Sequence, residues 1–146
     1  MIDPTTARAP ANVTSLLLEL LLTEVRETAQ PDEELAFLHS VGFQLAARYP
    51  LQSSGSLEAV EAELNDLFQH LGLGTVRLSV TKDGIHIRHR LLPVDGLEQD
   101  GAWRGALPRI LQGAYDAWLR SLGSGPKLHT TIVSSDGFTF EFRHGA

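Results

Sequence analysis

Apolar residues between positions 14 and 28 wrap most of the circumference of a predicted helix instead of forming one stripe. They are Leu16, Leu17, Leu18, Leu20, Leu21, Leu22 and Val25. A helix that is apolar on nearly all sides must be covered on more than one side. A domain of this size can rarely do that alone, so the pattern predicts that a partner protomer covers part of this helix.

Helical periodicity continues over residues 31–50, where Leu35, Leu38, Val41, Leu45 and Tyr49 recur at helical spacing. Pro31 suits the first helical position, and Pro50 ends the pattern. Gly42 falls in the middle of this helix, where glycine costs up to about 1 kcal/mol relative to alanine. Close approach of another backbone would explain that glycine.

A third, amphipathic helix is predicted over residues 57–71, and Gly72 lets the chain turn out of it. One face of this helix carries Leu57, Val60, Leu64, Leu67, Phe68 and Leu71. A fourth helical pattern covers residues 103–122. Pro108 interrupts that pattern, so the regular helix is predicted to begin at Pro108 and Trp103 to lie in a preceding turn.

Strand patterns flank Asp83-Gly84 and Asp136-Gly137, and each predicts a hairpin. The sequence therefore predicts an α+β fold with about four helices and a four-stranded antiparallel sheet built from two hairpins. Residues 1–12 hold two prolines and no apolar period, and we expect them to form a flexible N-terminal tail. Residues 13–146 are expected to form one domain, with a polar loop over 93–102.

The register of the first hairpin decides which side chains meet, because side chains in a strand alternate faces. A two-residue turn at Asp83-Gly84 gives one apolar face, with Val76, Leu78 and Val80 against Leu91, His89 and Ile87. In this register His86 and His89 point to opposite faces and cannot bind one metal. We expect His89 to be a core histidine with satisfied hydrogen bonds.

The opposite face of this hairpin carries Arg77, Arg88 and Arg90, with Arg77 opposite Arg90. Like charges in that position repel each other, so the pair needs solvent or an acidic partner surface. Two interpretations stay open for these arginines: a solvated sheet face, or a docking face for an acidic segment.

The second hairpin is predicted to turn over three residues, Ser135–Gly137, with Gly137 in a left-handed conformation. This register places Leu128, Thr130 and Ile132 beside Phe140 and Phe142. It separates His129 and His144 onto opposite faces, whereas a two-residue turn would make them a conceivable metal pair. Because a structural zinc site usually needs four protein ligands, we expect no metal site here.

Composition and charge narrow the function classes. The chain has 146 residues, a net charge of −6 and no cysteine, so thiolate catalysis and cysteine metal sites are excluded. An acidic protein is a poor binder of nucleic acid or anionic lipid. The stretch "SLLLELLLTEV" is too short to span a bilayer and is interrupted by Glu19, so we expect no membrane insertion.

Catalytic signatures are missing from the sequence, which has no G-x-S-x-G, no H-E-x-x-H and no P-loop lysine. We therefore expect no enzyme activity, no catalytic residue and no cofactor. The aromatic residues Trp103, Tyr115 and Trp118 could stack on sugars, but at this spacing we interpret them as core or interface anchors. The predicted oligomer interface comprises Leu17, Leu18, Leu21, Leu22, Val25 and Trp118.

Three segments carry a family resemblance: "FLHSVGFQLAARYP" (37–50), "LEAVEAELNDLFQHLGLGTVRL" (57–78) and "GAWRGALPRILQGAYDAWL" (101–119). In order and pattern they resemble the family of bacterial cellulose synthase D subunits, over about residues 16–142. The resemblance implies a non-enzymatic accessory protein that forms ring-like octamers from dimers and helps to order extruded glucan chains. Its partners would be the other proteins of the cellulose synthase complex and glucan chains. Because the tail over 1–12 departs from the family in sequence, no glucan-contact residue is assigned.

The resemblance leaves two further points open. We expect a position on the cytoplasmic side of the inner-membrane complex, with the periplasm as the alternative. A weaker resemblance, from a glycine-containing helix followed by a glycine-rich exit to a hairpin, connects the chain to ligand-binding domains related to vesicle-tethering proteins. That alternative implies a small-molecule sensor or adaptor, which should enclose an apolar cavity.

Overall fold

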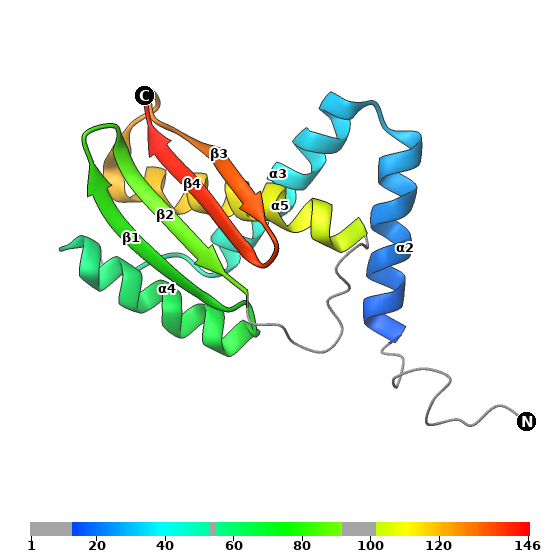
Figure 1. The fold of residues 1–146 in the computed structure, drawn as a ribbon, viewed down its shortest axis with the longest axis horizontal. Helices are drawn as coiled ribbons and strands as arrows, with labels where there is room; N and C mark the ends of the chain where they lie inside the picture. The colour runs from blue at the N-terminus through cyan, green and yellow to red at the C-terminus, as the bar shows by residue number, and fades with distance from the viewer. Residues whose placement is uncertain (1–12, 53–54, 92–101) are drawn as a thin grey trace, which may run out of the picture.

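The computed structural model describes residues 13–52, 55–91 and 102–146, in which three helices precede a hairpin, and a further helix precedes a second hairpin (Figure 1). The helices are α2 (Val13–Thr28), α3 (Pro31–Arg48), α4 (Leu57–Leu71) and α5 (Ala102–Leu119), and the π-helical turn η1 (Arg120–Ser124) follows α5. The strands are β1 (Thr75–Thr81), β2 (Gly84–Arg90), β3 (His129–Asp136) and β4 (Thr139–Gly145). This confirms the predicted α+β fold. The predicted tail over 1–12 and the predicted loop up to residue 101 lie outside the described residues.

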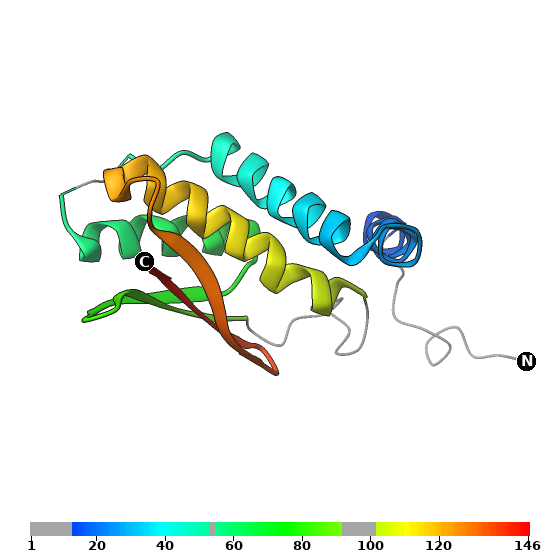
Figure 2. The same ribbon diagram turned by 90° about the horizontal axis from the view of Figure 1, so that it is seen from above.

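The four strands form one antiparallel sheet in the order β1-β2-β4-β3. α4 and α5 cover one face of this sheet, and α3 packs on the far side of α5 (Figure 2). α2 contacts α3 and α5 at the edge of the helical layer and does not reach the sheet. Over the described residues, the opposite face of the sheet carries no helix.

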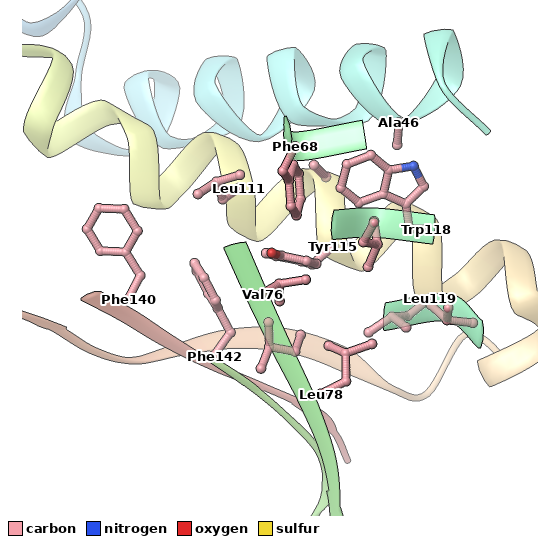
Figure 3. Close-up of a cluster of buried hydrophobic side chains, with 14 of the residues drawn as sticks. Ala46, Phe68, Val76, Leu78, Leu111, Tyr115, Trp118, Leu119, Phe140 and Phe142 are labelled. Atoms are coloured by element: carbon pink, nitrogen blue, oxygen red, sulfur yellow. The ribbon is translucent and has the colours of Figure 1, made fainter. Parts of the chain in front are cut away.

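The main core lies between the sheet and the helices α4 and α5. Its largest fully buried side chains include Phe68, Tyr115, Trp118, Phe140 and Phe142 (Figure 3). Tyr115 contacts Phe68, Trp118 and Phe142 edge to face or at a tilt, and Phe140 stacks on the ring of His89. The indole N–H of Trp118 donates a hydrogen bond of 2.9 Å to the carbonyl of Tyr49. The aromatic pattern of the sequence is therefore core packing that ties the end of α3 to α5.

Two of the predicted signals at helix ends are confirmed. Pro31 occupies the first turn of α3, and Gly72 ends α4 in a left-handed conformation with φ of 72°. Ser56 accepts a hydrogen bond from the backbone N–H of Ala59, which satisfies one of the free donors at the start of α4.

Gly42 confirms the predicted close approach of another backbone. A Cβ atom at Gly42 would lie 2.1 Å from the carbonyl oxygen of Ile110 and 2.6 Å from the nitrogen of Ala114. Gly113 on α5 is in the same position with respect to His39, whose carbonyl oxygen would lie 2.4 Å from an added Cβ. The helices α3 and α5 thus cross with their backbones in contact, and each contributes a glycine to the crossing.

The predicted start of the last helix is wrong. α5 begins at Ala102 and runs through Pro108 without a break, so Trp103 lies in its first turn. A proline inside a helix removes one backbone hydrogen bond and costs about 3 kcal/mol. Ala106, Leu107 and Ile110, which surround Pro108, are all buried. Burial of these neighbours offsets the cost and holds the helix together.

The first hairpin has the predicted faces but not the predicted register. Its two-residue turn is Lys82-Asp83, so Val80 pairs with Ile85 and Leu78 with Ile87. Gly84 belongs to strand β2, where an added Cβ would lie 2.2 Å from the carbonyl oxygen of His144 on β4. Gly84 therefore lets the backbone of β4 come close to β2, and it is not one of the two turn residues. Arg77 consequently lies opposite Arg88, and not opposite Arg90.

The second hairpin also turns at another place than predicted. Asp136 pairs with Thr139, so Gly137 and Phe138 form a two-residue turn, and a bulge between Ile132 and Ser134 shifts the pairing. Gly137 does have the expected left-handed conformation, with φ of 61°. Phe138 packs against the core, and its carbonyl accepts a hydrogen bond of 2.7 Å from Leu91. Ile132 therefore lies opposite Phe142 instead of Phe140.

Candidate functional site

The structure divides the apolar residues of α2 into two stripes. The inner stripe contains Leu18, Leu22 and Val25. Leu22 is buried with Leu38 and Ile110 of the neighbouring helices, whereas Val25 is half-buried and Leu18 is 38% exposed. Glu19 accepts a hydrogen bond of 3.3 Å from the backbone N–H of Trp103, and this contact connects α2 to the first turn of α5. The one acidic residue within the leucine run thus helps to orient α2 on the domain.

The outer stripe of α2 is the most extended row of exposed apolar side chains in the described chain. It comprises Val13, Leu16, Leu17, Leu20 and Leu21, and these side chains are 50–64% exposed. Their spacing of three and four residues places them on one side of the helix. We call this outer stripe the leucine face. A monomeric soluble protein rarely leaves such a row in water.

The residues of the predicted oligomer interface therefore divide among the leucine face, the inner stripe of α2 and the main core. Leu17 and Leu21 lie on the leucine face, whereas Leu18, Leu22 and Val25 lie on the inner stripe. Trp118 is 1% exposed inside the main core, so it has no surface left to offer a partner. Helical periodicity alone could not separate the two stripes of α2, because both are apolar.

A hollow of about 210 Å³ lies beside the inner stripe and is lined by Leu22, Val25, Arg26, Glu34, Leu38, Gly105 and Ala106. Pockets for small molecules usually measure about 300–1,000 Å³ and are mostly apolar. This hollow is smaller than that, and a guanidinium and a carboxylate form part of its wall. It gives no support to the alternative of a small-molecule sensor.

The second surface is the open face of the sheet, which we call the arginine face. It carries Arg77 on β1, Arg88 and Arg90 on β2, and Arg143 on β4, and the first three are exposed as predicted. Glu141 on β4 lies opposite Arg88, with its carboxylate 3.9 Å from that guanidinium and 3.8 Å from His86. One carboxylate is thus shared between two neighbouring cationic or titratable groups.

His89 lies on the covered face of the sheet, as expected, and is 0% exposed. Its Nε2–H donates to the carbonyl of Leu73 at 2.7 Å, so its Nδ1 must accept from the hydroxyl of Tyr115. Burial lowers the pKa of His89 from 6.5 to about 4, and the hydrogen bond to Leu73 opposes this only partly. Burial also raises the pKa of Tyr115 well above 10.0. His89 is a neutral core residue with both ring nitrogens satisfied.

A buried polar cluster at the start of β3 was not predicted from the sequence. His144 hydrogen-bonds the hydroxyls of Thr130 at 2.8 Å and Ser124 at 2.9 Å, and the Asp116 carboxylate lies 3.7 Å from its Nδ1. Burial is the main cause that lowers the pKa of His144. Asp116 also accepts from the backbone of Thr130 and pairs with Arg120 at 3.0 Å. These residues are far apart in sequence, so no local pattern could have shown the cluster.

The pair of Ser124 and His144 resembles a nucleophile beside a base, but its surroundings do not suit catalysis. The imidazole of His144 is 0% exposed, and its Nδ1 is occupied by Thr130 instead of being oriented by Asp116. Ser124 is half-buried, but the buried imidazole offers no exposed edge at which it could exchange a proton with a substrate. The cluster fastens the end of β4 to β3 and to the turn η1.

The described residues offer neither a metal site nor a membrane span. No group of three or more His, Asp or Glu side chains that could hold a metal ion occurs among them. His129 and His144 lie on opposite faces of the sheet, as predicted, since Thr130 and not His129 pairs with His144. None of the described helices is both long and apolar enough to cross a bilayer.

Together the fold and these surfaces define a small α+β protein with an exposed leucine face on one side and an arginine face on another. The family model that describes the D subunit of cellulose synthase matches residues 1–145. The chain therefore belongs to the family of cellulose synthase D subunits, which confirms the resemblance in the sequence. Membership implies a role within the cellulose synthase complex. No curated protein matched the chain.

Proposed function

We propose that this chain is a non-enzymatic accessory component of the bacterial cellulose synthase complex that self-associates into a scaffold and helps to organise extruded glucan chains. The observation that carries the proposal is the leucine face of α2. Five large apolar side chains in a row, each at least half exposed, favour burial against another protein surface. A second copy presents the same row, so two α2 helices can bury each other's leucines.

The geometry of α2 supports self-association in a second way. Leu17 and Leu21 are exposed, whereas Leu22 and the contact of Glu19 with Trp103 hold the helix on its own domain. The leucine face is thus presented by a packed helix, and covering it does not require that the domain opens. Association as dimers that build an octamer, and a position on the cytoplasmic side of the inner membrane, stay predictions.

We expect the purified protein to form particles of several protomers, eight by the family resemblance, in size-exclusion chromatography with light scattering. The double variant Leu17→Asp and Leu21→Asp should dissociate these particles, because each protomer would bury two unpaired charges in the contact. Its circular dichroism should stay unchanged, since both residues are exposed within the chain.

The matched control is Ala36→Asp, which adds the same kind of charge at an exposed position of α3 away from the leucine face. This variant should elute like the unchanged protein. A monomer at micromolar concentration for the unchanged protein would contradict the proposed scaffold.

Loss of the protein should affect the arrangement of cellulose and not its synthesis. We expect glucan polymerisation in purified membranes to be similar with and without this protein, because the structure offers no catalytic cluster in its described part. The amount or order of cellulose made by cells should decrease on deletion, as measured by electron microscopy and fibre diffraction. Abolished synthesis in membranes would refute the accessory role, and unchanged cellulose in cells would refute the organising role.

A further inference from the structure

The charge of this protein is distributed unevenly between its two sides. The chain carries a net charge of −6, yet the outward positions of β1, β2 and β4 hold four arginines and one glutamate. The acidic residues in the helices gather elsewhere, for example Asp32, Glu33 and Glu34 in the first turn of α3. The open face of the sheet is therefore a cationic surface on an anionic protein.

Among the arginines on this face, only Arg88 has a carboxylate partner within the described residues. Arg77 and Arg88 lie directly opposite each other in the ladder, where like charges destabilise the pair. Glu141 pairs with Arg88 and also accepts a hydrogen bond of 3.1 Å from Ser134. In the described residues no carboxylate lies within 4 Å of Arg77 or Arg90. An anion that docks here would relieve a repulsion already present in the fold.

The spacing of the arginines suits an extended chain. Arg88 and Arg90 alternate with the buried His89 on β2, so their side chains leave the same face about 6.7 Å apart, which is two residues of a strand. An extended peptide that carries a carboxylate at every second position repeats at the same distance. We propose that the arginine face binds an acidic, extended segment of a partner protein, with carboxylates at alternate positions.

A membrane surface fits this face less well. The outward positions of β1, β2 and β4 carry only Arg, His, Glu, Thr, Ser and Gly, and the exposed apolar side chain of β3, Val133, stands alone at the bulge. The hydroxyls of Thr75, Ser79 and Thr139 lie between the arginines in the ladders and can donate to carboxylates or peptide carbonyls. These features favour a peptide over an anionic lipid. The site is also separate from the leucine face, so the inference does not depend on the proposed self-association.

Binding can be tested with three labelled synthetic peptides and the full-length protein by fluorescence anisotropy. The first alternates glutamate with serine, the second has the same composition with all glutamates in one block, and the third replaces glutamate with glutamine. The alternating peptide should bind most tightly and the glutamine peptide should not bind. Affinity should fall as sodium chloride is raised, since exposed charges are screened beyond about 8 Å at physiological ionic strength.

The double variant Arg77→Gln and Arg90→Gln should weaken binding of the alternating peptide by about twofold to thirtyfold, from the usual strength of two exposed ion pairs. These two arginines contact no carboxylate in the described chain, so the fold and the particle mass should stay unchanged. The control pair Arg48→Gln and Arg109→Gln removes the same charge from exposed helix positions and should bind like the unchanged protein.

Two results would overturn the proposal. Equal weakening in both pairs of variants would show that only net charge matters. Stronger binding to phosphatidylserine vesicles than to the alternating peptide, lost in Arg77→Gln and Arg90→Gln, would reassign the face to lipid. Because particle mass is measured on the same samples, failure of peptide binding is distinguished from failure of the scaffold.

Discussion

Replacing Gly42 with alanine should destabilise the protein by about 3 kcal/mol or more, although alanine is the better helix former by about 1 kcal/mol. The added Cβ would lie 2.1 Å from the carbonyl oxygen of Ile110 and 2.6 Å from the nitrogen of Ala114. Both are backbone atoms of α5, so no side chain can rotate to make room. α3 and α5 would have to separate, and the packing between them would loosen.

Thermal unfolding followed by circular dichroism can measure this effect. For a domain of this size, a loss of about 3 kcal/mol corresponds to a decrease in Tm of roughly 6–12 °C. Gly113→Ala should act in the same direction, because its Cβ would lie 2.4 Å from the carbonyl oxygen of His39.

Gly105→Ala is the matched control on α5. An added Cβ there meets nothing within 4 Å, so the better helix propensity of alanine should stabilise this variant by up to about 1 kcal/mol. If Gly42→Ala behaved like Gly105→Ala, the close crossing of α3 and α5 would be wrong.

Acid should destabilise the folded protein between pH 6.5 and about pH 4, because His89 is held neutral in the core. The pKa of His89 falls from 6.5 to about 4 on burial, so in this range the unfolded chain binds a proton that the folded chain does not. The contribution of neutral His89 to the free energy of unfolding is therefore fully present above pH 6.5, and it is lost as the pH falls toward the pKa of the folded state. The difference between the two pKa values corresponds to about 3 kcal/mol.

Urea unfolding at pH 7, 6, 5 and 4 can measure this loss at one protein concentration, since association would also change the apparent stability. His144 adds to the loss in the same direction, because burial lowers its pKa too. The specific contribution of His89 is obtained from His89→Asn, which should be less stable at pH 7 but less sensitive to acid.

His70→Gln provides the control, because His70 is exposed on α4. The stability of the His70→Gln variant should depend on pH in the same way as that of the unchanged protein. If His89→Asn kept the full loss of stability between pH 6.5 and pH 4, the buried imidazole would not be its source.

Local patterns in the sequence were sufficient for the elements and their faces. The 3.6-residue period located the helices over 31–48 and 57–71, and Pro31 and Gly72 marked a start and an end. The alternation of apolar and polar residues placed His89 inside and Arg77 outside, although the predicted register was shifted. Such features depend on residues close in sequence, which is why a single chain reveals them.

The register of the first hairpin and the continuity of α5 through Pro108 depended on residues that are distant in sequence. β4 pairs with β2 from Ile85 onward and passes close to Gly84, so the turn moves to Lys82-Asp83. Burial around Pro108 keeps α5 continuous where local propensity predicts a break. In both cases a tertiary contact outweighs a local preference worth a few kcal/mol.

The two candidate surfaces, the leucine face and the arginine face, depend partly on the sequence alone and partly on the tertiary structure. The sequence by itself determined that α2 has more apolar residues than one face can hold, and that Arg77, Arg88 and Arg90 lie on the same side of a hairpin. Only the tertiary structure decided that Leu17 and Leu21 are exposed while Leu22 is buried, and that Trp118 belongs to the core. The physical reason is that periodicity states which side chains share a face, whereas exposure depends on which elements pack against that face.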